Sequence, residues 1–148
     1  MRIRAATQDD IPALAGLLSI LFAQEAEFQP DRDTQIRGLT LIIENPDIGM
    51  ILVAEQDDAL VGMVNLLFTV CTALGGRVAV LEDMVVCSDA RGSGLGTRLL
   101  KEAISFAKSR GCKRITLLTD HDNLAAQEFY RRNGFVSSGM IPLRLLID

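Results

Sequence analysis

Residues 81–100 read LEDMVVCSDARGSGLGTRLL, and this stretch decides the fold. An apolar run that carries two adjacent acids, Glu82 and Asp83, breaks into a glycine-rich turn, and the turn opens an amphipathic helical pattern. The first amides of a helix have no intrahelical partners, and glycine lets a phosphate approach the backbone closely. Arg91 adds a full positive charge beside the turn. The stretch therefore predicts a strand, an anion-binding turn and a helix, with a plain tight turn as the alternative.

Two common nucleotide-binding motifs do not fit this turn. A Walker A loop needs lysine and then Ser or Thr after its last glycine, whereas Gly96 is followed by Thr97 and Arg98. A dinucleotide fingerprint, GxGxxG, follows the first strand of a βαβ unit. Here the glycines alternate and lie past the middle of the chain. A nucleotide-binding switch is therefore disfavoured.

The rest of the chain predicts an α+β (mixed α/β) domain around one sheet. Apolar residues recur at helical spacing in some segments and form strand-like runs in others. The separators between the three middle runs are short enough for hairpins, so these runs should form an antiparallel meander. We expect helices near residues 7–22, 34–44, 95–110 and 123–133, and strands near residues 3–6, 50–55, 60–70, 77–86, 113–120 and, once or twice, 135–148.

Composition and charge narrow the class of protein. The 148 residues are 49% hydrophobic and 23% charged, which fits one globular domain over residues 1–148. The net charge of −4 argues against nucleic-acid binding, which needs a dense basic face. No apolar run approaches the ~20 residues of a membrane span, and the charged N-terminus lacks a signal-peptide core. We therefore expect a cytoplasmic protein with no membrane partner. The three cysteines show no zinc-ligand spacing, so no metal site is predicted.

Two motifs resemble those of the GNAT superfamily of acetyl-CoA-dependent N-acetyltransferases. The turn RGSGLG is similar to the signature (Q/R)-x-x-G-x-(G/A) through Arg91, Gly94 and Gly96. The segment NLAAQEFYRRNGF, residues 123–135, is similar to N-x-x-A-x-x-(F/L)-Y-x-x-x-G-F, and LEDMVV resembles the fourth strand of the family. The resemblance implies one mostly antiparallel sheet of six to seven strands, splayed between the fourth and fifth strands, with about four helices.

The resemblance also implies where acetyl-CoA, as co-substrate, would bind. The pyrophosphate would lie on the turn, the pantetheine arm would pair like a strand with the fourth strand, and Asn123 would contact the arm. The expected cofactor-binding residues are Met84, Val85, Val86, Arg91, Gly92, Ser93, Gly94, Leu95, Gly96, Thr97, Asn123 and Tyr130.

Tyr130 is the expected general acid. It is the only tyrosine in the chain, and it follows Asn123 by two helical turns, so the two residues share a helix face. By resemblance, its hydroxyl lies near the cofactor sulfur; a packing aromatic is the alternative. The backbone N–H of Val85 or Val86 is the expected donor to the oxyanion.

Glu82 and Asp83 are the candidates for the catalytic base. Adjacent strand residues point to opposite faces, so only one of the two should face the substrate. Alternation places Glu82 on the same face as Met84 and Val86, where burial would raise the pKa of its carboxyl. We therefore expect Glu82 as the base and Asp83 as the second candidate. Either acid could instead anchor a substrate ammonium or form a structural ion pair.

Two further segments are expected to select the substrate. In the family this task falls mostly to the loop between the first two helices and to the last strands, here residues 23–33 and 136–144. Phe28 could wall an aliphatic or aromatic substrate in the first of these segments. An ordinary solvated loop is the alternative.

The sequence thus predicts a bacterial N-acetyltransferase in which a primary amine attacks acetyl-CoA directly in a ternary complex. An acetyl-cysteine intermediate on Cys87 is disfavoured, because nothing near it in the sequence lowers the pKa of the thiol. A small-molecule amine is the expected acceptor, with a protein N-terminus or lysine as the alternative. A non-catalytic acyl-CoA sensor is the alternative from another class. Members of the family are often dimers, so a homodimer is also considered.

Overall fold

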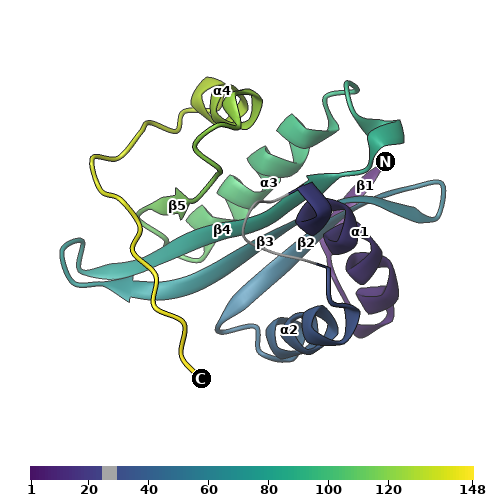
Figure 1. Ribbon diagram of the computed structural model, residues 1–148, viewed down its shortest axis with the longest axis horizontal. Coiled ribbons are helices and arrows are strands. Elements are labelled where there is room, and N and C mark those ends of the chain that lie inside the picture. Colours follow the sequence, from purple (N-terminus) through teal and green to yellow (C-terminus); the bar gives the residue numbers. More distant parts are fainter. Residues whose placement is uncertain (25–29) are drawn as a thin grey trace. The chain divides into compact units, whose positions relative to one another are not determined.

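The computed structural model describes residues 1–24 and 30–148 (Figure 1). The chain divides into two compact units, Met1–Leu118 and Thr119–Asp148. Among the described residues, the first unit holds the sheet with three α-helices, and the second holds one α-helix and the C-terminal segment.

The first unit is built on a five-stranded sheet with the strand order β1-β2-β3-β4-β5. Its strands are β1 (Arg2–Ala5), β2 (Gly49–Gln56), β3 (Ala59–Cys71), β4 (Gly76–Val86) and β5 (Ile115–Leu117). The first four are antiparallel to their neighbours, and β5 is parallel to β4. Asp57 and Asp58 have positive φ in the β2–β3 hairpin, as the favoured two-residue turns require. The predicted antiparallel meander is therefore confirmed.

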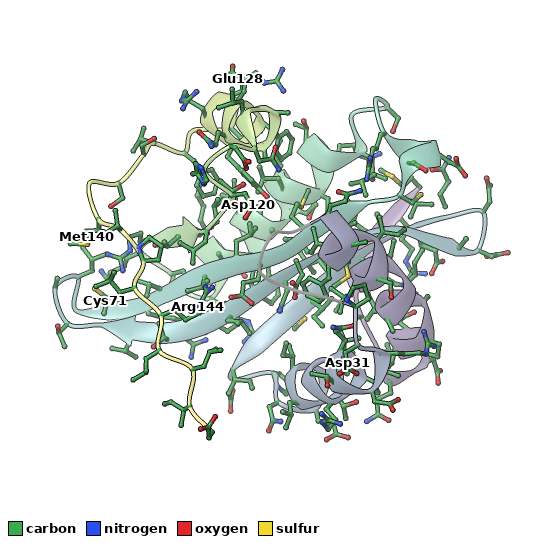
Figure 2. The ribbon with its side chains drawn as sticks, in the orientation of Figure 1. Asp31, Cys71, Asp120, Glu128, Met140 and Arg144 are labelled. Carbon is green, nitrogen blue, oxygen red and sulfur yellow. The ribbon has the colours of Figure 1, made fainter. Side chains whose placement is uncertain are left out.

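Three α-helices pack in this unit: α1 (Ile11–Gln24), α2 (Arg32–Glu44) and α3 (Leu95–Ser109). Two short 3₁₀ turns, η1 (Gln8–Asp10) and η2 (Ser88–Ala90), precede α1 and α3. The Asp31 side chain accepts a hydrogen bond from the Thr34 N–H at 3.3 Å and so caps the start of α2 (Figure 2). In the described part of the chain, no helix is long and apolar enough to cross a bilayer.

Apolar side chains fill both faces of the sheet. On one face the buried residues of α1 and α2 pack against alternate strand residues; this cluster comprises Leu14, Ala15, Leu17, Leu18, Leu39, Ile51, Val53, Met63 and Val85. The intervening strand residues point to the other face, where α3 lies (Figure 1). Leu99 and Leu100 of α3 are fully buried, and burying one such side chain contributes roughly 1.5–3 kcal/mol. Packing on both faces holds β3 and β4, which carry the site, in a fixed frame.

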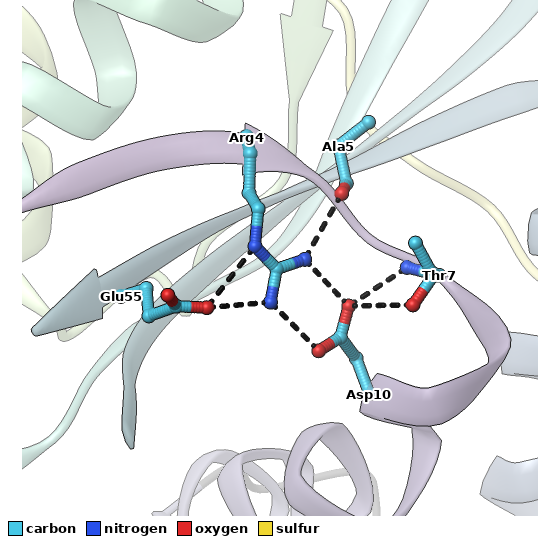
Figure 3. Close-up of polar contacts among 5 residues, drawn as sticks. All are labelled: Arg4, Ala5, Thr7, Asp10 and Glu55. Carbon is cyan, nitrogen blue, oxygen red and sulfur yellow. Dashed lines mark hydrogen bonds and ion pairs between the residues drawn. The ribbon is translucent and has the colours of Figure 1, made fainter. Parts of the chain in front are cut away.

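Arg4 on β1 ties the sheet to the start of α1 (Figure 3). Its guanidinium donates to the Asp10 carboxylate at 2.8 and 2.9 Å and to Glu55 on β2 at 2.7 and 3.1 Å. It also donates to the Ala5 carbonyl, and the Thr7 N–H donates to Asp10 at 2.7 Å. The hydrogen bond from Arg4 holds the pKa of the Asp10 carboxyl below its ordinary value. The network therefore fixes where α1 begins above the sheet.

The second unit contains α4 (Leu124–Arg132). The Asn123 side chain accepts a hydrogen bond from the Ala126 N–H at 3.1 Å and caps the helix. At the other end, the Phe135 N–H donates to the Tyr130 carbonyl at 3.1 Å. The predicted helix near residues 123–133 is therefore confirmed.

Residues 135–148 form neither helix nor strand, so the expectation of six to seven strands is wrong for the described chain, which has five. The apolar composition of this segment favoured a strand, but strand propensity depends on packing and pairing with a neighbour. Pro142 has no N–H to give to a ladder, and Gly139 weakens a strand interior. From Val136 onward the large apolar side chains of the segment are exposed, as Met140 illustrates (Figure 2).

Candidate functional site

β4 and β5 separate after three residue pairs. The parallel ladder joins residues 79–81 to residues 115–117, whereas β4 pairs with β3 as far as Val86. The predicted splay between the fourth and fifth strands is therefore confirmed. Along residues 82–86, the edge of β4 away from β3 has no strand partner in the described chain. An extended ligand can pair with backbone groups on such an edge.

A β-bulge interrupts β4 at the two acids. Met63 and Asn65 are two residues apart on β3, but their partners Val85 and Glu82 are three residues apart, so β4 holds one extra residue. Asp83 lies in the bulge with φ of 54°, in the left-handed region that non-glycine residues seldom adopt. The extra residue reverses the direction in which alternate backbone groups point.

This reversal turns two residues of β4 toward the open edge. Before the bulge, odd-numbered residues bond toward β5, as the Ala79 N–H does at 2.9 Å. After the bulge, the Cys87 N–H donates to a β3 carbonyl at 2.8 Å, so odd-numbered residues now point to β3. Val85 is therefore directed toward β3, and Met84 and Val86 present their backbone groups at the open edge. Of the two amides expected to donate to an oxyanion, that of Val86 is the one directed to the open edge.

The open edge leads into the glycine-rich turn. Gly92 and Gly94 have φ of 82° and 80°, a conformation that a residue with a Cβ adopts only with strain. The Ser93 hydroxyl donates to the Ala90 carbonyl at 2.6 Å and braces the turn. The glycines and Ser93 are exposed, so a ligand can reach their backbone.

The turn delivers the chain to the N-terminus of α3. The Arg98 N–H donates to the Gly94 carbonyl at 3.1 Å, so the amides of residues 95–97 precede the first intrahelical bond. The Arg91 Nε–H donates to the Val86 carbonyl at 3.1 Å, which ties this cation to the end of β4. Free amides, the helix dipole and the charges of Arg91 and Arg98 together suit an anionic phosphate.

Asp83 is the more shielded of the two acids: it is half-buried, whereas Glu82 is exposed. Burial, followed by the charge of Glu82, raises the pKa of Asp83 to about 6, and a hydrogen bond from Asn65 acts in the opposite direction. The expectation that Glu82 lies on a buried apolar face is wrong. Strand alternation does not carry across a bulge, and β4 loses its β5 neighbour at this point.

Asn65 on β3 is a polar residue that the sequence reasoning missed. It is 2% exposed, and its Nδ2–H donates to Asp83 Oδ2 at 3.4 Å. Its Oδ1 has no hydrogen-bond partner among the described residues. A buried acceptor left unsatisfied costs about 1–3 kcal/mol. The signal that could have found it is a lone amide within the apolar run LVGMVNLLFTV, residues 60–70.

Tyr130 and Asn123 lie in the second unit, on α4 and at its cap. The Tyr130 ring contacts Phe129 and Phe135 edge-on, with centroids 5.2 and 5.6 Å apart. Burial raises the pKa of Tyr130 to about 12, so its phenol keeps its proton at neutral pH. The expected parts of Tyr130 and Asn123 in catalysis and cofactor binding stay predictions.

Two further residues were considered from the sequence: Phe28 for substrate binding and Cys87 for an acetyl-cysteine intermediate. Phe28 lies outside the described residues. Cys87 is half-buried and packs against the core cluster of α1 and α2, which fits a packing role.

The sequence matches the model of the acetyltransferase (GNAT) family over residues 14–135. This range includes β4, the glycine-rich turn, α3 and α4. It therefore covers every described element that the two sequence motifs occupy.

Known proteins agree with this family match. The chain is 34% identical over 139 residues to an uncharacterized N-acetyltransferase of Bacillus subtilis strain 168, YhfO, covering 91% of this chain and 89% of that protein. It is 26% identical over 136 residues to the aminoalkylphosphonate N-acetyltransferase of Salmonella typhimurium, with 92% and 85% covered. An integron cassette protein from the mobile metagenome of Cole Harbour Salt Marsh has a similar crystal structure, with a TM-score of 0.86, 28% identity, and 99% and 90% covered. The chain therefore belongs to the GNAT family of N-acetyltransferases.

Proposed function

We propose that this enzyme, acting as one domain over residues 1–148, transfers the acetyl group of acetyl-CoA to a primary amine of a small molecule. The observation that carries the proposal is the open edge of β4, which leads through the short η2 turn to the exposed glycine-rich turn and the N-terminus of α3. GNAT enzymes use acetyl-CoA, and one relative of this chain is named for a small amine, an aminoalkylphosphonate. The choice of a small-molecule amine as the acceptor rests on the similarity to that relative.

The binding residues follow from the same geometry. We propose that the amides of residues 92–97, with the charge of Arg91, hold the pyrophosphate. The backbone groups of Met84 and Val86 would pair with the amides of the pantetheine arm, as an added strand pairs with a sheet edge. The N–H on this edge that lies nearest the acetyl group would stabilise the thioester oxygen as negative charge develops on it.

The acid–base roles follow from the two raised pKa values. We propose that Asp83, rather than the exposed Glu82, accepts the proton of the attacking amine, because a carboxyl with a pKa of about 6 is a stronger base than an ordinary one and is still ionised at neutral pH. The amine nitrogen forms a bond to the carbonyl carbon as the carbon–sulfur bond breaks. Following the resemblance, the Tyr130 hydroxyl donates its proton to the departing thiolate.

The first test is calorimetric titration with acetyl-CoA, followed by thiol release with a panel of small amines. We expect binding and amine-dependent release, and we expect Arg91→Ala to weaken acetyl-CoA binding about tenfold because one charge-assisted contact is lost. Lys101→Ala is the matched control, because it removes the same charge from an exposed position on α3 and should leave the affinity unchanged.

Three other results would contradict this proposal. No binding of acetyl-CoA would mean that the turn is not a cofactor site. Binding without release on any amine would favour a non-catalytic sensor. Release only with peptides that carry a free N-terminus or lysine would replace the small-molecule acceptor with a protein.

The base is tested by Asp83→Asn and Glu82→Gln, which remove one charge each from adjacent positions. We expect Asp83→Asn to lower kcat about 10²- to 10⁴-fold, the usual contribution of a general base. Glu82→Gln should retain most activity and move the acid limb of the pH–rate profile to lower pH, because the Glu82 charge raises the pKa of Asp83. The same amine is used throughout, so that its own ionisation cancels. Loss of activity in Glu82→Gln alone would assign the base to Glu82 instead.

The acid is tested by Tyr130→Phe, which removes only the hydroxyl and keeps the ring contacts. We expect kcat to fall about 10²-fold while the Kd for acetyl-CoA stays the same, since a proton donor acts only as the thiolate leaves. Phe129→Leu serves as the control for a packing effect on the same helix. An unchanged kcat in Tyr130→Phe would leave Tyr130 as a packing aromatic.

A further inference from the structure

Asn65 is a polar residue buried among apolar side chains, which is unusual for a residue with a purely structural role. Its neighbours on β3, Val64 and Leu66, are fully buried, and Asn65 itself is 2% exposed. Among the described residues, only Asn65 and Asp10 are buried polar side chains, and Asp10 is satisfied by the Arg4 network. An apolar side chain at position 65 would leave no acceptor unsatisfied. The fold alone therefore gives no reason for an amide here.

The contact that Asn65 does make lies at the bulge. Its Nδ2–H donates to Oδ2 of Asp83, while its Oδ1 has no partner in the described part of the chain. The hydrogen bond from Asn65 is also the one side-chain hydrogen bond that Asp83 makes among the described residues. One carboxylate oxygen is thereby held, and the other is left for a further donor.

We propose that Asn65 is a positioning residue for acetyl transfer, holding one oxygen of Asp83 so that the other faces the acceptor amine. This inference rests on the proposed function, in which Asp83 accepts the proton of the amine. An amide suits the task because its Nδ2–H donates to the carboxylate and so favours the ionised form of Asp83, which is the form that accepts a proton.

The charges around Asp83 are few, so its response to Asn65 can be measured. Glu82, next to it on β4, raises its pKa. The elements packed on β4 add little: α1 and β5 carry no titratable side chain, and β3 carries only Cys71 at its far end. The charged residues of α3 that lie toward solvent are Arg98, Lys101, Glu102 and Lys108.

The test is the pH dependence of kcat/KM in Asn65→Leu, measured with the Kd for acetyl-CoA and the Tm. Leucine fills the apolar surroundings but cannot donate to Asp83. We expect at least a tenfold lower kcat, a Kd within twofold, and an acid limb moved to higher pH, because the hydrogen bond from Asn65 favours ionised Asp83. Asn65→Ser, which keeps a hydroxyl donor, should show a smaller shift in the same direction, and it provides the measurement if the leucine variant does not fold.

Met63→Leu is the matched control, because it changes a buried residue on the same face of β3 without touching a polar group. In Met63→Leu the acid limb of the pH profile of kcat/KM should lie at the same pH as in the unaltered protein. The inference about Asn65 would be overturned, and the proposed function kept, by one combination of results. In that case the unaltered protein turns over the amine, and the acid limb of the pH profile of kcat/KM stays at the same pH in both Asn65 variants. No amine-dependent thiol release by the unaltered protein would overturn the proposed function, and the inference with it.

Discussion

The separation of β4 from β5 after Leu81 is the constraint on which the rest of the site depends. The backbone N–H and C=O groups of a strand inside a sheet form hydrogen bonds to the two neighbouring strands, so none is available for a ligand. β4 keeps β3 on one side through Val86 but loses β5 on the other, so its last residues can bind an extended molecule. The packing of α1, α2 and α3 on the two faces holds the strand in place while that edge stays open.

The bulge at Asp83 gives this open edge its chemistry. One extra residue reverses the ladder, so that Met84 and Val86 face the edge and Val85 faces β3. The same residue carries a carboxyl whose pKa is raised to about 6 by burial and by Glu82. Under the proposed function, this single local irregularity would supply both the backbone donors for acetyl-CoA and the base for the amine, within a few residues of the turn that suits a phosphate.

The sequence predicted the parts of this arrangement that leave a pattern in residue types. The glycines and Arg91 indicated the turn, periodicity indicated the helices and the meander, and the resemblance indicated the splay. The bulge leaves no such pattern, because LEDMVV reads as a regular apolar strand and its extra residue shows only in the pairing with β3. The prediction that Glu82 is the buried acid failed for that reason. The apolar C-terminal segment was assigned to strands because composition does not reveal whether a partner strand exists.

The most direct test of the central claim is residue-resolved amide hydrogen exchange with and without acetyl-CoA. If the open edge of β4 and the turn form the binding site, the amides of Met84, Val86 and residues 92–97 should exchange more slowly when acetyl-CoA is present. The Val85 amide, already directed toward β3, should change little. Slowed exchange at Val85 without a change at its two neighbours, or protection confined to elements other than β4 and the turn, would contradict the account.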